Sequence, residues 1–257
     1  MSDISEVTVL KIGGSVLTDK SKEKTLKLGE INRIAKEVAS ADVKDLIIVH
    51  GAGSFGHPQA KRFDLDVPGK CGYETILIHN IVKELNRVFI EKLAENGMLV
   101  VPIHPLNCTI SREGWLENMM TDQIRLMLKN DIVPVFHGDV VMDRIWGRAI
   151  LSGDQIVAHV AKCLNAGRVG IGTNVDGIMD GKKVLDVITP EEFCGVKKLL
   201  KGSRDVDVTG GMASKANELF KLAEEGISSH VFNASKKGLV MNFLSGERNF
   251  GTIIRGD

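Results

Sequence analysis

Short apolar runs alternate along this chain with longer segments of helical periodicity. The runs that predict strands are Val7–Lys11, Leu46–Val49, Leu99–Pro102, Ile132–Phe136, Arg168–Gly172, His230–Phe232 and Gly251–Ile254. Apolar residues recur at helical spacing in Leu28–Ala39, Thr75–Glu95, Thr121–Lys129, Gly153–Leu164 and Met212–Glu225. Such alternation predicts an α/β protein with a largely parallel sheet that is covered by helices on both faces.

Two hairpins and two irregular stretches complete this prediction. A polar turn separates Val140–Met142 from Arg148–Leu151, and Asp180-Gly181 is typical of a tight hairpin turn. The stretches Lys61–Gly72 and Gly195–Gly211 show no periodicity, so we expect loops there. No repeat or low-complexity linker interrupts the 257 residues, a length that allows one large domain or two small ones.

The composition is that of an ordinary globular protein and argues against several classes of function. Hydrophobic residues make up 43% and charged residues 26%, and the formal net charge is zero. A nucleic-acid-binding protein needs positive charge to neutralise phosphates, so we expect no nucleic-acid partner. No apolar run reaches the roughly 20 residues of a membrane helix, and the first residues lack the pattern of a signal peptide. Because the four cysteines are also far apart, we expect a cytoplasmic protein with reduced thiols and no membrane partner.

The most informative segment is a glycine-rich loop that follows a predicted buried strand. The run Leu46–Val49 leads directly into His50–His57, whose sequence is HGAGSFGH. Glycines after a strand let backbone N–H groups approach an anion without a Cβ in the way. Gly51, Gly53 and Gly56 also fit a dinucleotide-binding fingerprint, but no acidic residue ends a second strand about 20 residues later. A phosphate-binding loop is therefore favoured over a nicotinamide site.

Four further turns of small residues lie at predicted strand or helix ends. They are Lys11–Ser15 (KIGGS), Ser152–Asp154 (SGD), Gly172–Gly177 (GTNVDG) and Asp207–Lys215 (DVTGGMASK). Each has an ordinary explanation when taken singly, as a tight turn, a helix N-cap or a surface lysine. Open α/β sheets bind ligands at the carboxyl ends of their strands, so the joint occurrence of these turns predicts one phosphate-binding site.

In their order along the chain, these segments resemble the motifs of the amino acid kinase superfamily. The similarity extends over essentially the whole chain, and within the superfamily it is greatest to the archaeal-type isopentenyl phosphate kinases. The specific markers are His57 in Gly53–His57 and Lys20 in Leu17–Lys20. The resemblance implies a three-layer αβα sandwich with an open, mostly parallel central sheet. It also implies a homodimer of one amino acid kinase domain, residues 1–257, with an acceptor-binding lobe over about 1–165 and a nucleotide-binding lobe over about 166–257.

The same resemblance implies that a phosphoryl group passes from ATP to isopentenyl phosphate in the presence of Mg2+. The residues that it implies in catalysis are Lys11, Lys20, His57 and Asp154. Those implied in ATP binding are Lys11, Gly13, Gly14, Ser15, Gly53, Asn174, Gly211 and Lys215, and those implied in acceptor binding are Ala52, His57 and Gly153. Lys11 would contact the transferred phosphate, Lys20 would stabilise transition-state charge, and Asp154 would orient these two lysines. His57 would donate a hydrogen bond to the phosphate that the acceptor already carries.

One position departs from the pattern of the family. Asn174 stands where relatives commonly have aspartate, in the motif Thr-Asp-Val-Asp-Gly. If this position contacts the nucleotide through its main chain, the change is harmless. If it acts through its side chain, nucleotide affinity or preference differs from that of the relatives.

An isoprenoid acceptor and a carboxylate acceptor would need different side chains in the site. An isoprenoid tail requires an apolar slot, and Thr75–Glu95 carries a stripe formed by Ile78, Ile81, Leu85, Val88 and Phe89. We expect most of this stripe to be core, with room for a row that faces the ligand. A carboxylate acceptor would instead need an arginine clamp, for which Arg62 and Arg87 are available. The histidines at positions 50, 79, 104, 137 and 159 lack metal-ligand spacing, so we expect packed or surface residues and no protein-bound metal.

Two alternative functions stay open at this point. A phosphonate kinase of the fosfomycin type would share Lys20 and His57, because a phosphonate resembles a phosphate. A non-catalytic nucleotide-binding protein with the same fold is less consistent with Lys11, Lys20 and Asp154 together, because a protein that only binds needs no lysine at the transition state.

Overall fold

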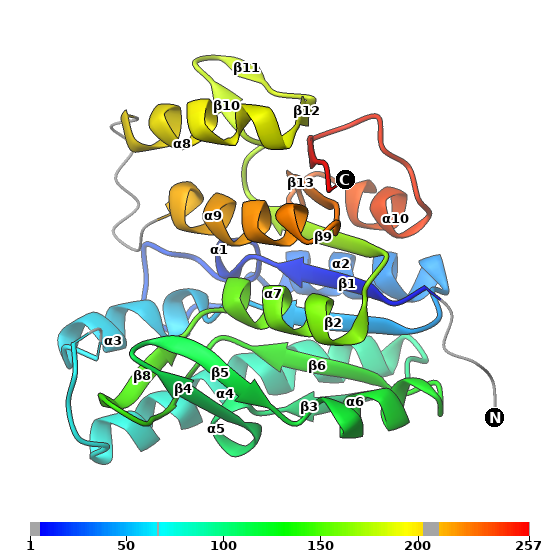
Figure 1. Ribbon diagram of the computed structural model, residues 1–257. Helices are drawn as coiled ribbons and strands as arrows, with labels where there is room; N and C mark the ends of the chain where they lie inside the picture. Colours follow the sequence, from blue (N-terminus) through cyan, green and yellow to red (C-terminus); the bar gives the residue numbers. More distant parts are fainter. Residues whose placement is uncertain (1–5, 66, 203–210, 257) are drawn as a thin grey trace.

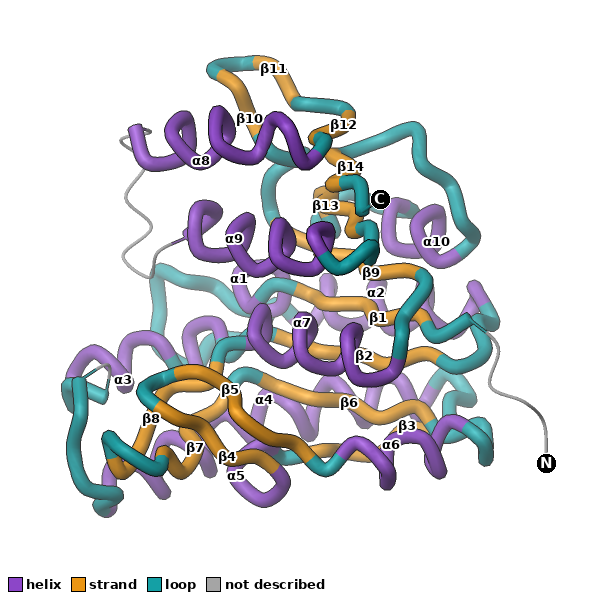
Figure 2. Tube along the Cα trace, in the orientation of Figure 1, coloured by secondary structure: helices purple, strands orange, loops and turns teal. Residues whose placement is uncertain are grey.

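The computed structural model describes residues 6–65, 67–202 and 211–256, without the side chains of 201–202 and 211–214. Its centre is a sheet of eight strands in the order β12–β14–β13–β9–β1–β2–β6–β3. These strands are β1 (Thr8–Ile12), β2 (Leu46–His50), β3 (Val100–Ile103), β6 (Val133–His137), β9 (Arg168–Thr173), β12 (Val187–Ile188), β13 (Ser229–Asn233) and β14 (Thr252–Ile254). Neighbours from β13 to β3 pair in parallel, and only the β13–β14 pairing in this sheet is antiparallel. The six strands from β13 to β3, which lie side by side in Figure 2, therefore all end at one edge of the sheet.

Helices cover both faces of this sheet (Figure 1). One face carries α2 (Leu28–Ala41), α4 (Tyr73–Glu95) and α10 (Leu239–Leu244), and the other carries α6 (Thr121–Leu128), α7 (Gly153–Leu164), α8 (Phe193–Gly202) and α9 (Gly211–Glu224). Successive strand residues point to opposite faces, so Val9 packs in the α7–α9 core layer and Leu10 in the α2–α4 layer. The expected αβα sandwich with a mostly parallel sheet is confirmed.

A second, smaller sheet lies beside the carboxyl end of β6. Its strands β4 (Thr109–Arg112), β5 (Trp115–Met119), β7 (Asp139–Asp143) and β8 (Gly147–Leu151) follow the order β5–β4–β7–β8, and α5 (Pro105–Cys108) precedes β4. The antiparallel pair β7–β8 confirms one predicted hairpin, and β10 (Met179–Asp180) with β11 (Lys183–Val184) confirms the other. Sequence patterns did not predict β4 and β5, because neither contains an apolar run.

One predicted loop is in part a helix. Residues 195–202 of the stretch Gly195–Gly211 belong to α8, so the expected loop is wrong there, and residues 203–210 lie outside the described residues. Phe193 and Val196 are buried against the core, which fixes the helix through packing rather than through local propensity. Of the described residues in Lys61–Gly72, Lys61 and Arg62 alone are helical, at the end of α3 (His57–Arg62). Among the described residues, no helix is long and apolar enough to cross a membrane.

Candidate functional site

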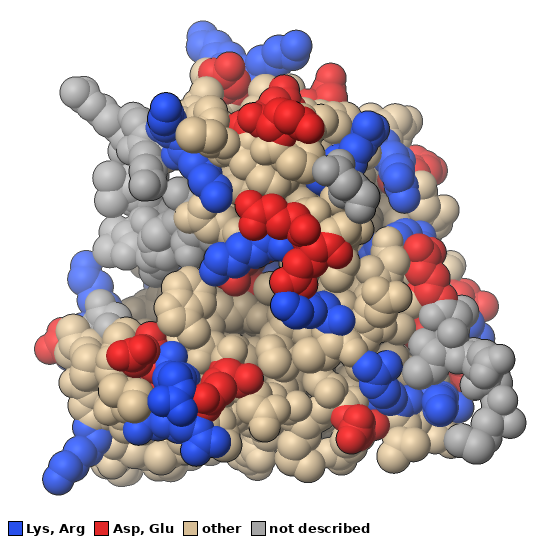
Figure 3. Space-filling model, in the orientation of Figure 1, with Lys and Arg blue, Asp and Glu red and all other residues tan. Residues whose placement is uncertain are grey.

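Three backbone turns meet at the edge where the parallel strands end. The short helix α1 (Gly14–Leu17) follows β1, the 3-10 turn η1 (Gly53–Phe55) follows β2, and α7 begins at Gly153. The N–H of Gly51 donates to the carbonyl oxygen of Ile12 at 3.0 Å, and the N–H of Gly13 donates to that of Gly172 at 2.7 Å. These hydrogen bonds hold the turns after β1, β2 and β9 together. Figure 3 shows a hollow in the surface on this side of the molecule.

Glycine is required where the first two turns touch. A Cβ on Gly14 would lie 2.3 Å from the backbone nitrogen of Gly53, a distance that no packing tolerates. Gly53 also has a φ of +53°, in the left-handed region that favours glycine. The two turns therefore meet backbone to backbone, which brings their peptide groups close together. Such an arrangement suits an anion held by several main-chain N–H groups.

A buried carboxylate at the start of α7 joins two lysines from distant parts of the chain. The Nζ atom of Lys11, near the end of β1, donates to an oxygen of Asp154 at 2.7 Å. The Nζ atom of Lys215, in the first turn of α9, lies 3.0 Å from the other oxygen. Ser152 caps α7, since its side chain accepts a hydrogen bond from the N–H of Gln155, and this fixes Asp154 in the first turn. The result is two ammonium groups on one carboxylate beside the glycine turns.

Burial and the charges of neighbouring side chains set the protonation states of Lys11 and Asp154. Lys11 is only 4% exposed, and its burial lowers its pKa to about 8, an effect strengthened by Lys215 and opposed by Asp154. Burial would raise the pKa of Asp154, but Lys11 and Lys215 outweigh it and hold that pKa well below its usual range. Near neutral pH the carboxylate is charged and Lys11 is mostly protonated, so the site carries net positive charge.

The lowered pKa of Lys11 predicts a loss of activity in mild alkali. As the pH rises past about 8, Lys11 loses its proton and its attraction for phosphate, so kcat/KM should fall. Lys215 lowers the pKa of Lys11, so Lys215→Met should move this fall to higher pH, even though it also reduces activity. Phosphorus NMR assays from pH 6.5 to pH 9.5 would measure both profiles. A fall at the same pH in both proteins would contradict the assignment to Lys11.

The other predicted catalytic residues, Lys20 and His57, come shortly after the turns that follow β1 and β2. Lys20 is exposed in the turn between α1 and α2, and His57 is the exposed first residue of α3. The backbone N–H of Lys24, in the same turn as Lys20, donates to the carbonyl oxygen of Ser54 at 3.1 Å. The turn that carries Lys20 is therefore bound to the loop that leads to His57.

The residues predicted on the nucleotide side lie at the ends of β9 and α9. Asn174 follows β9 and is exposed, and Gly211 is the first residue of α9. The rest of the predicted motif, Asp207–Gly210, lies outside the described residues. Two residues after Asn174, the carboxylate of Asp176 accepts a hydrogen bond from Asn233 at 2.8 Å and pairs with Lys236 at 2.8 Å.

The apolar stripe of α4 is divided between two core clusters. Ile81, Leu85 and Phe89 pack in the core layer between the sheet and helices α2 and α4, as expected for most of the stripe. Ile78 and Val82 belong to a separate small cluster. Its other members are Ala60 and Leu65 after the glycine loop and Val140 on β7, with Ala52, Phe63 and Ile150 packed against them. This small cluster lies beside the His57 loop, since a Cβ on Gly56 would lie 3.4 Å from the side chain of Val82.

Four of the histidines form a packed network behind the glycine loop. His50 contacts the amide of Asn86 at 3.0 Å, His104 lies 2.8 Å from His137, and His79 pairs with Asp139 at 2.9 Å. Burial lowers the pKa of His50 to about 3 and that of His104 to about 4, so both are neutral at physiological pH. In the described part of the chain, no group of three His, Cys, Asp or Glu residues is arranged to hold a metal ion. These histidines support the loop by packing.

The sequence patterns did not predict that Gly138 belongs to the site or that Lys215 contacts Asp154. The N–H of Gly138 donates to the carbonyl oxygen of His50 at 2.9 Å, and a Cβ there would lie 3.6 Å from the backbone nitrogens of both Ala52 and Gly153. A glycine directly after a buried strand was the available signal. Lys215, predicted on the ATP side, is bound to the same carboxylate of Asp154 as Lys11, a contact that the sequence did not predict.

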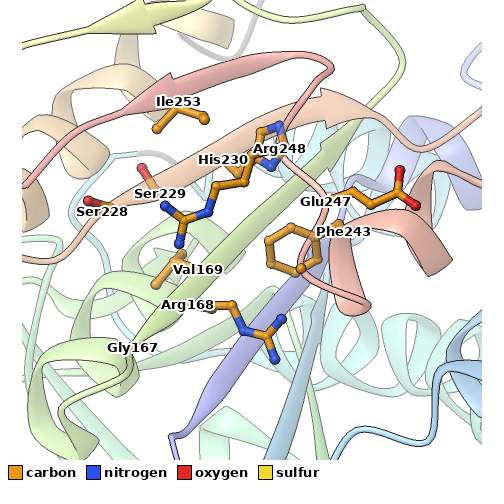
Figure 4. Close-up of a pocket in the computed structure, with 11 residues that line it drawn as sticks. Gly167, Arg168, Val169, Ser228, Ser229, His230, Phe243, Glu247, Arg248 and Ile253 are labelled. Atoms are coloured by element: carbon orange, nitrogen blue, oxygen red, sulfur yellow. The ribbon is translucent and has the colours of Figure 1, made fainter.

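A hollow elsewhere on the surface is separate from this site (Figure 4). Arg168, Ser229 and Arg248 are among its lining residues. Arg168 and Ser229 are the first residues of β9 and β13, so the hollow lies at the edge where these strands begin. It faces away from Lys11 and Asp154 and adds nothing to their chemistry.

Comparison with known proteins shows the family to which this chain belongs. The profile of the amino acid kinase family matches residues 6–233. An isopentenyl phosphate kinase of Methanothermobacter thermautotrophicus is 36% identical and covers 96% of this chain and 98% of its own length. One from Methanocaldococcus jannaschii is 33% identical, with 94% of this chain and 96% of its own length covered.

The solved structures give the same result for the fold. A crystal structure of an isopentenyl phosphate kinase superposes with a TM-score of 0.83 at 32% identity, over 96% of this chain and 100% of that one. The family match spans the strands and turns that carry Lys11, Asp154 and Lys215. This chain is a member of the amino acid kinase family.

Proposed function

We propose that this protein is an ATP-dependent kinase that phosphorylates isopentenyl phosphate to isopentenyl diphosphate. The observation that carries the proposal is the position of His57, at the end of a loop whose glycines pack on the turn after Lys11. A histidine there suits an acceptor that already carries a phosphate. The relatives named isopentenyl phosphate kinase support this choice of acceptor.

The reaction needs positioning and charge neutralisation rather than covalent help from the protein. An oxygen of the acceptor phosphate attacks the γ-phosphorus of ATP, and the bond from that phosphorus to the bridging oxygen of ADP breaks. Lys11 contacts the transferred group, and Lys20 approaches it as charge develops. The N–H groups of Gly14, Ser15 and Gly53 hold the phosphates of ATP, and Gly13, whose own N–H is bound to Gly172, places this turn beside them. Asp154 keeps the ammonium groups of Lys11 and Lys215 in place.

The acceptor binds on the other side of the glycine loop. His57 donates a hydrogen bond to its phosphate, and the main chain of Ala52 and Gly153 lies alongside. The small apolar cluster around Ile78 and Val82 is next to this loop, where it suits a five-carbon apolar tail. Burial of such a tail contributes a few kcal/mol to binding, at about 0.8 kcal/mol per CH2.

We assign the two substrates to the two parts of the chain that meet at residues 165 and 166. In this proposal the acceptor-binding lobe covers about residues 1–165, and the nucleotide-binding lobe, with Asn174, Gly211 and Lys215, covers about residues 166–257. Asn174 contacts the nucleotide through its main chain in this proposal. Support comes from its place at the carboxyl end of β9, where open α/β sheets bind ligands.

Mg2+ enters this site with ATP. The carboxylate of Asp154 is already bound to two lysines, and the described residues offer no cluster of three metal-binding side chains. Mg2+ commonly keeps several waters and binds substrate phosphates, which fits such a site. Bound in this way, it would neutralise charge between the β- and γ-phosphates.

We also infer a homodimer that works in the cytoplasm. β3 is an edge strand of the central sheet, and Leu99 beside it is 64% exposed. An edge with exposed apolar residues is typical of a surface that pairs with another chain.

The four cysteines are all free, which suits a reducing compartment such as the cytoplasm.

A panel of acceptors tests the proposed function. Phosphorus NMR with ATP and Mg2+ should show the two coupled resonances of a new diphosphate when isopentenyl phosphate is added. Fosfomycin and N-acetylglutamate should turn over far more slowly. Faster turnover of fosfomycin would favour a phosphonate kinase, and ATP binding without any phosphorylated product would favour a non-catalytic nucleotide-binding protein.

Replacing His57 with alanine tests its assignment to the acceptor. His57→Ala should raise the KM for isopentenyl phosphate by about 10- to 100-fold, because a hydrogen bond to a charged group contributes roughly 1.5–3 kcal/mol. The KM for ATP should change less than twofold. Lys61→Ala, at an exposed position of the same helix, is the matched control and should keep the acceptor KM. An unchanged acceptor KM in His57→Ala would remove the proposed role.

A further inference from the structure

A buried threonine hydroxyl joins two of the turns in the site. Thr18 is fully buried, and its Oγ1 donates to the carbonyl oxygen of Gly14 at 2.8 Å. The same oxygen accepts a hydrogen bond from the backbone N–H of Ser54 at 2.9 Å. The contact is close, since a Cβ on Gly53 would lie 2.2 Å from it. One hydroxyl therefore bridges the turn after Lys11 and the loop before His57.

Ser54 continues these contacts to the turn that carries Lys20. Its side chain is also buried, and its Oγ accepts a hydrogen bond from the backbone N–H of Thr25 at 3.2 Å. Its carbonyl oxygen accepts one from the N–H of Lys24 at 3.1 Å. We refer to the hydrogen bonds of the Thr18 and Ser54 side chains as the Thr18–Ser54 clip.

The turn itself is closed at its base by the same residues. Thr18 and Leu26 form an isolated antiparallel bridge, and the N–H of Asp19 donates to the carbonyl oxygen of Thr25 at 2.9 Å. The Asp19 carboxylate accepts hydrogen bonds from the N–H and the hydroxyl of Ser21, on the other side of Lys20. The backbone on both sides of Lys20 is therefore restrained, although its side chain is exposed.

We propose that Thr18 and Ser54 are positioning residues that set the place of Lys20 relative to the acceptor loop. The clip makes the turn of Lys20 and the loop of His57 move as one unit, so the backbone from which Lys20 reaches the transferred group is placed relative to the acceptor loop before substrates bind. This inference rests on the proposed function, because it concerns the transfer to an acceptor held near His57. A misplacement of about 1 Å is enough to lower a rate by roughly a hundredfold.

Removal of the Thr18 hydroxyl is the direct test. Thr18→Val keeps the shape of the side chain and should lower kcat by about 10- to 100-fold, with the KM for ATP within twofold of the natural protein. Thr18→Ser restores the hydroxyl and should return kcat to within about threefold. Thr8→Val is the matched control, because Thr8 is also fully buried, and its hydroxyl has no hydrogen-bond partner among the residues that the structure describes.

A merely structural role predicts a different result. In that case Thr18→Val would lower the melting temperature and leave kcat of the folded enzyme unchanged, which would overturn the proposal. Equal loss of activity in Thr18→Ser and Thr18→Val would do the same. A rise in the KM for ATP that matches the loss of kcat would place the effect at the nucleotide and would also overturn it.

A double-mutant cycle tests whether Thr18 acts through Lys20. When Lys20 is alanine, its position no longer matters, so Thr18→Val should lower kcat by less than about threefold in the Lys20→Ala protein. An undiminished effect in that background would show that the clip acts on something else. Turnover of isopentenyl phosphate by the unchanged protein separates these outcomes from failure of the proposed function, which would abolish the reference activity itself.

Discussion

Replacing Lys20 with alanine is expected to lower kcat by about a hundred- to a thousandfold and to leave the stability of the fold unchanged. Lys20 is proposed to meet charge that develops on the transferred phosphoryl group only in the transition state. An interaction of that kind affects kcat more than substrate binding, so the KM for ATP should change less than fivefold. Because the side chain is exposed in a turn, its removal leaves no cavity.

Lys22 provides a matched control two residues along the same turn. It is also an exposed lysine, so Lys22→Ala removes the same charge from nearly the same place. This variant should keep kcat within twofold. Such a result would show that Lys20 acts through a specific contact and not only through the positive charge that it adds near the site. Steady-state assays at saturating ATP and isopentenyl phosphate measure both variants. Similar rates for the two would remove the role assigned to Lys20.

Replacing Asp154 with asparagine is the second large expected effect, with a loss of kcat of about a hundred- to a thousandfold. Asparagine keeps the shape but removes the charge between Lys11 and Lys215, so the two ammonium groups repel one another. The pKa of Lys11 should then fall below about 8, because Asp154 is the group that raises it. The kcat/KM of Asp154→Asn should therefore rise by more, as the pH is lowered from 8 to 6.5, than the roughly twofold rise expected of the natural protein, in which Lys11 is half-protonated near pH 8.

The same substitution is expected to lower the free energy of unfolding by about 3 kcal/mol, since it leaves a buried cation without its partner. The carboxylate of Asp154 has a lowered pKa in the folded state, so its stabilising effect is complete above about pH 4 and is lost as the pH falls further. Urea unfolding at pH 7 and at lower pH measures this contribution.

Asp131→Asn is a control, because Asp131 pairs with Lys44 on the surface and should contribute less than about 1 kcal/mol. Full activity of Asp154→Asn at every pH would contradict the role of this carboxylate.

Local patterns predicted the elements that have strong local causes. Leu46–Val49 was expected as a strand from its β-branched apolar residues, and β2 covers Leu46–His50. Gly153–Leu164 was expected as a helix from its N-cap and periodicity, and α7 has those bounds. In both cases the signal is contained within a few neighbouring residues.

Elements that form only through contacts with distant parts of the chain were not predicted. β5 alternates weakly and has mostly exposed or half-buried residues, so only its pairing with β4 makes it a strand. α8 carries its apolar residues toward α9 and the core, and two glycines obscure its helical pattern in the sequence. Tertiary packing outweighs local propensity at such places.

The sequence alone determined which chemical groups the site contains, because glycine turns after buried strands and lysines next to them are local features of the chain. The tertiary structure decided which groups act on one another. Lys11 and Asp154 are 143 residues apart and share a hydrogen bond, and Lys215 reaches the same carboxylate from 61 residues away. Thr18 and Ser54 became neighbours only when β1 and β2 paired. Contacts of this kind depend on strand order and burial, which no local pattern records.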